Sequence, residues 1–203
     1  MMRPTLPVLA VLLAVAAPAL AATGPTTILD QVEGGRFALD KNHAKIIFST
    51  THFGFSTYYG LFTAFDAKLD FDPKAPAKSS LEVTVDLNGI DTTNPKLDAH
   101  LKSPDFFDVA RFPTATFKTT RIEVTGKTTG KITGDLTLHG VTRPVVLDAS
   151  FNGGGINPMS KAYVVGVNAT GTVQRSQFGI TTFVPMVGDD VGLTISGEFD
   201  RVK

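Results

Sequence analysis

The chain has 203 residues, of which 19 are basic and 19 acidic, so its formal net charge at pH 7 is zero. Its basic residues are scattered rather than clustered in a stripe, which excludes a nucleic-acid-binding surface from the expected functions. Cysteine is absent, which excludes disulfides, a lipidated-cysteine anchor and a cysteine nucleophile.

Residues 1–21 are typical of a cleavable secretory signal. Arg3 supplies the basic start, residues 6–17 form the apolar run, and residues 19–21 form a small-residue cleavage site. The apolar run is shorter than the roughly 20 residues of a spanning helix, so it predicts no stable membrane anchor. We therefore expect one mature domain over residues 22–203, located in the periplasm.

The mature chain has an all-β pattern. After a polar lead over residues 23–35, alternating segments follow one another, separated by Gly, Pro, Asn and Asp turns. In the clearest segment, residues 59–71, apolar side chains share one face and charged side chains share the other. The same alternation recurs at residues 81–88, 131–138, 141–151 and 191–199. About eight antiparallel strands with one buried side are predicted.

One short helix is predicted within residues 94–108. Asn94 is a favourable N-cap, Pro95 suits the first helical position, and two Leu residues four positions apart give one apolar side. The turn at residues 103–108 then joins two adjacent Phe residues to acidic neighbours, and Asp105 after a proline suits a short helical turn. This turn is expected to act as an apolar plug.

Periodicity alone leaves the architecture open between a barrel and a sandwich. About eight antiparallel strands can close into a barrel with room for a small ligand, or they can pack as two sheets. Both arrangements have the same alternation. It identifies the buried face without showing whether side chains or a ligand fill the space behind it.

Several segments, in order along nearly the whole mature chain, carry a resemblance to a known family. They are residues 37–43, 51–56, 90–94, 98–108, 133–145, 175–180 and 187–191. Together they resemble the YceI-like family of bacterial periplasmic proteins. The resemblance implies a single antiparallel, extended lipocalin-like β-barrel whose cavity holds a polyisoprenoid or similar lipid, and it implies a homodimer.

Two positions depart from the family pattern. Leu97 stands where relatives often have Arg, and Gln177 stands where many have Asp. Both changes are expected to alter selectivity for the lipid head group. An ordinary lipocalin is disfavoured, because its Gly-x-Trp signature cannot occur in a chain without Trp.

The predicted ligand site consists of apolar residues that line the cavity and a few polar residues. The apolar candidates are Ile46, Phe48, Phe53, Phe55, Phe65, Leu101, Phe106, Phe107, Phe117, Leu136, Leu138, Phe178 and Ile180. The polar candidates are His52, Asp98, His100 and Arg175. Ordinary core packing is the alternative for each apolar residue, since cores and cavity walls use the same residue types.

Two of the polar candidates have roles that the sequence leaves open. His52 has the parity of Ile46 and Phe48, so it is expected to face the same interior, as a head-group partner or as a structural histidine. Arg175 could pair with a pyrophosphate or quinone oxygen through its planar guanidinium, or form a structural ion pair with an Asp.

Enzyme and metal signatures do not emerge from the sequence. The four His residues are widely separated and lack metal-ligand spacing, and neither a Gly-x-Ser-x-Gly motif nor a phosphate loop occurs. No catalytic residue, metal or cofactor is predicted, and the expected ligand is a bound isoprenoid lipid or quinone.

The leading hypothesis is a periplasmic carrier that encloses a long isoprenoid, such as a polyprenyl phosphate or an isoprenoid quinone. One alternative is an enzyme that acts on an amphiphilic substrate through His52, Asp98 and His100. Another is a stress or interaction protein whose barrel is filled by its own side chains.

Overall fold

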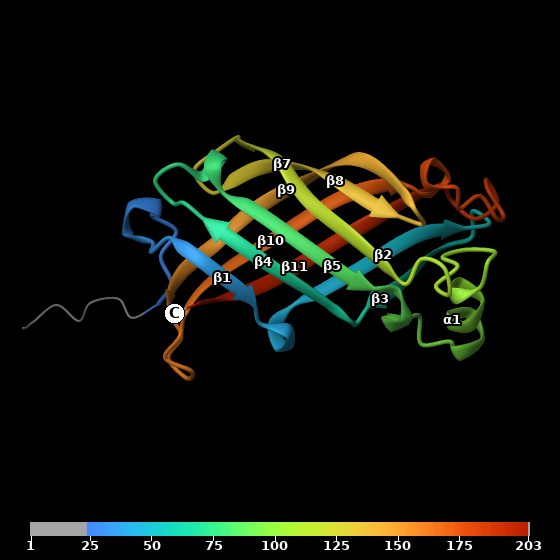
Figure 1. Ribbon diagram of the computed structural model, residues 1–203, viewed down its shortest axis with the longest axis horizontal. Coiled ribbons are helices and arrows are strands. Elements are labelled where there is room, and N and C mark those ends of the chain that lie inside the picture. Colours follow the sequence, from blue (N-terminus) through green and yellow to red (C-terminus); the bar gives the residue numbers. More distant parts are fainter. Residues whose placement is uncertain (1–23, 203) are drawn as a thin grey trace, which may run out of the picture.

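The computed structural model describes residues 24–202, so the predicted signal at residues 1–21 lies outside the described part. Within it, eight antiparallel strands close into an elongated barrel (Figure 1). In order around the barrel they are β1 (Gly35–Leu39), β4 (Phe65–Phe71), β5 (Ser80–Asp86), β7 (Thr114–Val124), β8 (Thr129–Leu138), β9 (Val141–Ile156), β10 (Tyr163–Gln174) and β11 (Asp190–Arg201). Pairing of Phe37 with Arg201 joins β1 to β11 and closes the ring, which confirms the predicted barrel.

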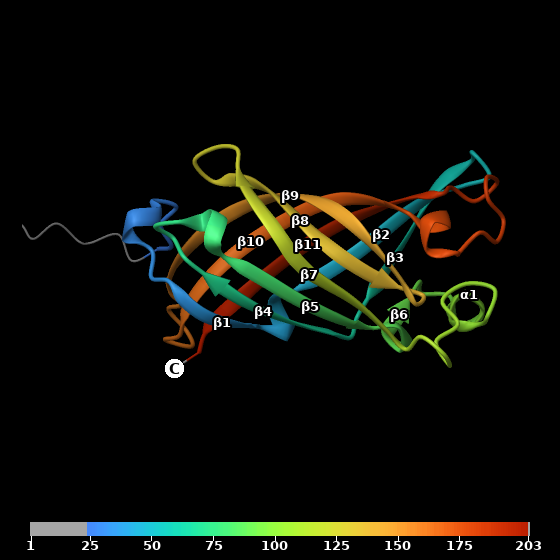
Figure 2. The same cartoon turned by 45° about the horizontal axis from the view of Figure 1, so that its top comes forward.

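Three further strands extend the wall at one end. β2 (Lys45–His52) follows β1 after a 3-10 turn at Lys41–His43 and pairs with β11. β3 (Ser56–Phe62) pairs with β2, and β6 (Ile90–Asp91) pairs with two residues of β3. Figure 2 shows the β2–β3 hairpin reaching past the rim of the barrel, beside the loop that joins β10 to β11.

The one α-helix in the described part of the chain, α1 (Pro95–Lys102), lies at this same end, and its prediction is confirmed (Figure 1). Asn94 caps it by accepting hydrogen bonds from the backbone N–H groups of Lys96 and Leu97. The chain then turns back on itself, and the backbone N–H of Phe107 donates to the carbonyl of Leu101 at 3.0 Å. No helix within residues 24–202 is long and apolar enough to cross a membrane.

Two apolar clusters hold the barrel together. One consists of Val32, Phe37, Ala67, Val165 and Phe199, and the other of Phe117, Val145, Leu147, Val173 and Phe178. Glycine makes room for aromatic rings on neighbouring strands. A Cβ atom at Gly60 would lie 2.3 Å from Cζ of Phe48, and one at Gly134 would lie 2.3 Å from Cζ of Phe117. Both glycines therefore allow a ring to lie flat over the adjacent strand.

The barrel has two unlike ends. The end we call the α1 end carries α1, the tip of the β2–β3 hairpin, the β8–β9 turn and the β10–β11 loop. The opposite end, called the far end, carries residues 24–34, the β4–β5, β7–β8 and β9–β10 turns, and residues 201–202.

Candidate ligand-binding cavity

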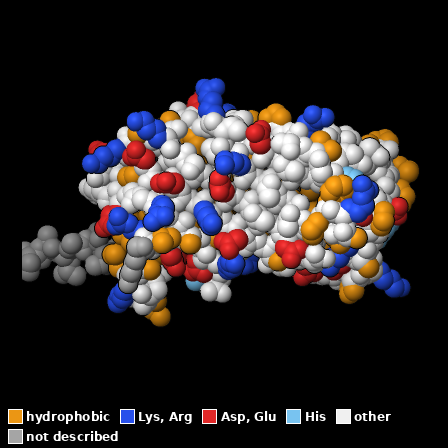
Figure 3. Space-filling view, in the orientation of Figure 1, with side chains coloured by type: hydrophobic (Ala, Val, Ile, Leu, Met, Phe, Trp, Pro, Cys, Tyr) orange, Lys and Arg blue, Asp and Glu red, His pale blue; other side chains and the backbone are white. Residues whose placement is uncertain are grey.

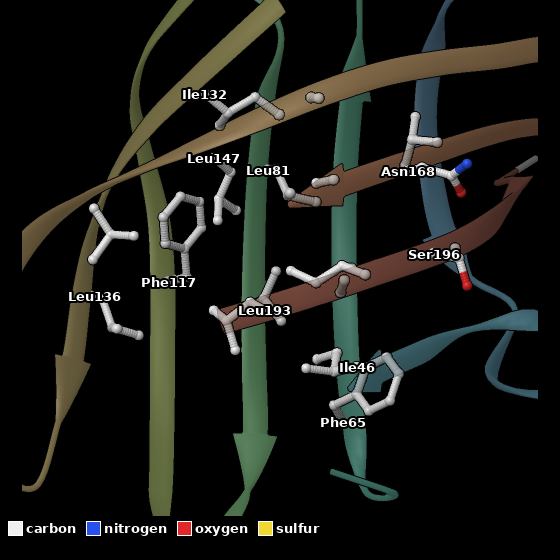
Figure 4. Close-up of a pocket in the computed structure, with 18 of the residues that line it drawn as sticks. Ile46, Phe65, Leu81, Phe117, Ile132, Leu136, Leu147, Asn168, Leu193 and Ser196 are labelled. Carbon is white, nitrogen blue, oxygen red and sulfur yellow. The ribbon is translucent and has the colours of Figure 1, made fainter. Parts of the chain in front are cut away.

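A cavity of about 380 Å³ occupies the inside of the barrel. Its lining side chains come from all eight barrel strands and from β2 and β3. Figure 4 shows apolar side chains from several strands pointing into one space, with Phe117 and Leu136 on one side and Ile46 and Phe65 on another. The volume lies within the range of small-molecule sites, about 300 to 1,000 Å³.

The lining is almost wholly apolar, and its only charged residues within residues 24–202 are Arg175 and Lys127. Arg175 lies at the α1 end, and Lys127 lies in the β7–β8 turn at the far end. No Asp or Glu contributes to the lining in this part of the chain. Such a wall favours a hydrocarbon chain through the hydrophobic effect, and it places no carboxylate against an anionic group.

Most of the predicted apolar residues line this cavity. They are Ile46, Phe48, Phe65, Leu101, Phe106, Phe107, Phe117, Leu136, Leu138 and Ile180. The turn after α1 brings Phe107 against the wall, where its ring centre lies 6.1 Å from that of Phe62. The structure thus brings the predicted wall together, and contact of each residue with a ligand stays a prediction.

Three predicted apolar residues lie outside the cavity. Phe53 and Phe55 lie at the tip of the β2–β3 hairpin, beyond the cavity, and are 45% and 91% exposed. Phe178 lies in the 3-10 turn after β10 and is 1% exposed, packed in the second apolar cluster rather than on the cavity surface. Phe178 therefore matches the core-packing alternative, whereas the other two are surface residues.

His52 also lies outside the cavity. It keeps the parity of Ile46 and Phe48, but β2 continues past the lined space, so the side chain emerges exposed at the strand end. Its ring packs edge-on against Phe53, with ring centres 4.6 Å apart. Strand parity identified the face correctly but could not indicate where along the strand the cavity ends.

Asp98 and His100 are engaged in structural contacts on α1 and do not line the cavity. The Asp98 carboxylate accepts hydrogen bonds from the backbone N–H and the hydroxyl of Thr92, at 2.8 and 2.6 Å, and so fixes the connection from β6. Nε2 of His100 lies 3.0 Å from a carboxylate oxygen of Asp105. With His52 packed against Phe53, the three residues are engaged separately and do not share one centre.

Arg175 is buried, 7% exposed, and holds the β10–β11 loop. Its guanidinium donates four hydrogen bonds of 2.9 to 3.0 Å, to the carbonyls of Ile180, Thr182, Val187 and Gly188. Burial lowers the pKa of Arg175 from its ordinary value, and the charge of Asp189 opposes this shift. Carbonyl contacts take the place of the ion pair with an Asp, which was one of the two alternatives for Arg175, and only one of the five N–H groups of its guanidinium remains for a ligand.

Asp189, at the other end of the β10–β11 loop, accepts a hydrogen bond from the backbone N–H of Arg175 through its backbone carbonyl at 3.0 Å, but its side chain has a different partner. Its carboxylate accepts from the backbone N–H and the hydroxyl of Ser176, at 2.8 and 2.7 Å.

The two positions that depart from the family pattern are also away from the cavity. Leu97 is half-buried on α1, and the side chain of Gln177 donates to that of Gln174 on the surface. Their effect on head-group selectivity stays a prediction.

Much of the aliphatic wall was missed at the sequence level. It includes Leu81, Val83, Leu147, Leu193 and Ile195. The alternation at residues 81–88, 141–151 and 191–199 held the signal, because it already assigned these side chains to the buried face. Lys127 had no such signal, since a basic residue in a hairpin turn is usually solvated.

Within residues 24–202, one group of potential metal ligands lies on the outer wall, formed by Asp40, His43 and Glu198, with ligand atoms within 4.8 Å of one another. Asp40 caps the Lys41–His43 turn through the N–H of Asn42, and its carboxylate lies 2.7 Å from Nδ1 of His43. That hydrogen bond raises the pKa of His43 and lowers the pKa of Asp40. This contact explains why Asp40 and His43 lie close together without an ion.

Comparison with known proteins agrees with this architecture. The model of the YceI-like domain matches residues 37–199. A UPF0312 protein of Ectopseudomonas mendocina is 40% identical over 177 residues, which cover 86% of this chain and 92% of that protein. A UPF0312 protein of Pectobacterium atrosepticum is 40% identical over 168 residues, or 83% of this chain and 86% of that one.

Solved structures are similar as well. The YceI protein of Campylobacter jejuni aligns with a TM-score of 0.68 and 30% identity, over 75% of this chain and 90% of that one. Burkholderia cenocepacia BcnA aligns with a TM-score of 0.72 and 22% identity, over 79% and 98% of the two chains. A polyisoprenoid-binding domain of Saccharophagus degradans, implicated in plant cell wall breakdown, aligns with a TM-score of 0.57 and 11% identity, over 84% and 100%.

Proposed function

The chain belongs to the YceI-like family, and we propose that it is a binding protein that encloses a long isoprenoid-type lipid in its barrel. The observation that carries the proposal is the cavity, which is apolar along the barrel and, over the residues that the structure describes, free of acidic side chains. The description of the Saccharophagus degradans domain as polyisoprenoid-binding supports the ligand class, because the two barrels share a fold. A polyprenyl phosphate or an isoprenoid quinone has the required chain.

The energetics favour such a ligand. Burial of one CH₂ group is worth about 0.8 kcal/mol, so a five-carbon isoprene unit gains roughly 3 to 4 kcal/mol as an upper bound. Phe48, Phe65 and Phe117 supply large apolar contacts in the lining. Binding by enclosure needs no bond to be made or broken, so the proposal includes no catalytic step.

We place this function in the periplasm as part of the proposal. The secretory pattern of residues 1–21 supports export, and the lack of cysteine is compatible with a fold that needs no disulfide. A lipid with a long hydrocarbon chain is poorly soluble in the water between two membranes. A barrel that buries the chain would carry it through that space.

The two alternative functions receive less support from the geometry. An enzyme would need His52, Asp98 and His100 in one site, but His52 packs on Phe53, and the other two bind Thr92 and Asp105. A barrel filled by its own side chains would leave no space of about 380 Å³.

Native mass spectrometry of protein purified from a periplasm without detergent tests the proposal. We expect a stoichiometric prenyl lipid or quinone to co-purify, and solvent extraction should identify its head group. Protein that is reproducibly empty, and that fails to take up added quinone and polyprenyl phosphate, would refute the proposal.

A further inference from the structure

Four apolar side chains project into solvent at the α1 end. They are Phe53 and Phe55 on the β2–β3 hairpin and Phe183 and Met186 in the β10–β11 loop, and we call them the aromatic tip. Their exposed fractions are 45%, 91%, 47% and 53%. Figure 3 shows apolar side chains gathered at the right-hand, α1 end of the molecule.

Backbone hydrogen bonds join the two loops into one surface. The N–H of Phe53 donates to the carbonyl of Met186 at 2.7 Å, and the N–H of Gly188 donates to the carbonyl of Thr51 at 2.9 Å. The hydroxyl of Thr182 donates to the carbonyl of Asp105 at 2.6 Å, which ties the same loop to the turn after α1. The aromatic tip is therefore held in place by the fold.

Both loops lack charge over long stretches. The sequence contains no Asp, Glu, Lys or Arg between Lys45 and Asp66, nor between Arg175 and Asp189. The far end also exposes apolar residues, but its most exposed one, Met159 at 89%, lies two residues from Lys161. A surface that is apolar and uncharged fits a partner that is itself apolar, because no charge has to be desolvated on contact.

Two residues of the aromatic tip have a strained backbone. Phe53 has φ of 51° and Phe183 has φ of 61°, in the left-handed region that bulky residues rarely adopt. Each side chain is nearly half exposed, so it is only partly packed within this chain. Strain of this kind is concentrated at functional sites, which supports a role for these rings outside the fold.

The aromatic tip is continuous with the cavity. Ile180 and Val187 line the cavity and belong to the same loop as Phe183 and Met186. The ring of Phe106, another lining residue, has its centre 6.4 Å from that of Phe183. Residues that line the cavity therefore lie next to the exposed rings of the aromatic tip.

We propose that the aromatic tip docks on the surface of a lipid bilayer and that the lipid passes between membrane and cavity at the α1 end. The inference rests on the proposed function, because a ligand dissolved in a bilayer has to be collected there. Aromatic rings favour the interface between head groups and acyl chains. A second copy of this chain is disfavoured as the occupant, because a stable dimer buries about 800 Å² per partner, which four side chains on a projecting tip do not supply.

The lack of Trp in the chain allows a direct test. Phe55→Trp places a single indole on the aromatic tip, and Met159→Trp places one at a far-end position of matched exposure, 89% against 91%. With vesicles of phosphatidylcholine alone, we expect a blue shift of the indole emission of the Phe55→Trp protein and none for the Met159→Trp protein. The shift should persist at high salt, because the tip carries no charge.

Equal shifts in the two variants, or no shift in either, would overturn the docking proposal. A blue shift of the Phe55→Trp emission that increases with protein concentration in the absence of vesicles, together with a dimer in analytical ultracentrifugation, would also overturn the docking proposal. It would show that the aromatic tip contacts a second copy of the chain. Phe183→Ser should lower co-sedimentation with the vesicles about tenfold. Native mass spectrometry of the same samples separates the docking proposal from the proposed function. A protein that is loaded with a prenyl lipid but does not bind vesicles refutes docking alone. A protein that is empty but binds vesicles refutes the carrier function.

Discussion

The two ends of the barrel are stabilised in different ways. At the far end, Phe37, Val165 and Phe199 form an apolar cluster, and the surface ion pair of Glu33 with Arg201 joins residues far apart in the sequence. At the α1 end, the buried Arg175 holds an uncharged loop through backbone carbonyls. The difference indicates that the far end secures the closure of the barrel, while at the α1 end the β10–β11 loop beside the cavity has no charged side chain between Arg175 and Asp189.

The largest expected effect follows from removal of the buried cation. Arg175→Met leaves the carbonyls of Ile180, Thr182, Val187 and Gly188 without their donor, so we expect the free energy of unfolding to fall by about 3 to 5 kcal/mol. Urea unfolding measures the change. The control is Arg143→Met on the exposed face of β9, expected to stay within about 0.5 kcal/mol. Similar losses in both variants would contradict the role of Arg175.

A smaller effect of opposite sign is expected at the aromatic tip. Phe53→Asn replaces a bulky residue at φ of 51° by one that tolerates the left-handed region, so the free energy of unfolding should rise by about 0.5 to 1 kcal/mol. Thermal unfolding measures this gain, and vesicle co-sedimentation should weaken in the same protein. A loss of stability would show that packing of the Phe53 ring outweighs its backbone strain.

At the far end, loss of the surface ion pair should have little effect. Glu33→Gln removes the charge opposite Arg201, and both side chains are about half exposed, 52% and 43%. Exposed ion pairs contribute about 0.2 to 1 kcal/mol, and salt screens them. Urea unfolding at low and high salt tests this. A loss as large as that for Arg175→Met would remove the contrast between the two ends.

The smallest effect concerns the outer wall, where Asp40 contacts His43. The contact raises the pKa of His43, so its contribution is complete below the ordinary value of 6.5 and fades as pH rises through the folded value. It lowers the pKa of Asp40, whose contribution is complete above 3.8 and fades as pH falls. The stability difference between wild type and His43→Gln should therefore be greatest from about pH 4 to pH 6.

Urea unfolding across this pH range, with an NMR titration of His43, measures the effect. Because His43 is exposed, only a slight change in stability is expected. A difference that grows above pH 8 would contradict the assigned direction of the shift.

Individual helices and strands could be predicted from local patterns, because capping residues and the alternation of apolar side chains depend on neighbouring positions in the sequence. Asn94 and Pro95 predicted where α1 begins, and the alternation of residues 65–71 predicted the half-buried strand β4. The predicted segment 59–71 was wrong over residues 59–62, which belong to the separate strand β3, because there Tyr59 is 62% exposed and Phe62 lines the cavity. Closure into a barrel depends on contacts between distant strands, such as Phe37 opposite Arg201, which periodicity does not encode. The family resemblance supplied that step.

The site was harder to predict for the same reason. Strand parity assigned His52 to the inner face, but the point where the cavity ends depends on the loops that cover it. Phe178 is of a residue type that lines cavities, but its side chain packs in the second apolar cluster and does not reach the cavity surface. The partners of Arg175 are backbone carbonyls, which no residue type in the sequence reveals.

The central claim is that the cavity holds a long-chain lipid. Its most direct test is a substitution that places a large side chain inside the cavity. Ala169 lines it, and its neighbour Thr170 lies exposed on the opposite face of β10. Native mass spectrometry after incubation with a polyprenyl phosphate or an isoprenoid quinone should show one bound lipid on the wild type and on Thr170→Phe, and none on a folded Ala169→Phe protein. Equal lipid loading of the two variants would contradict the account, and so would the absence of bound lipid from both variants and the wild type.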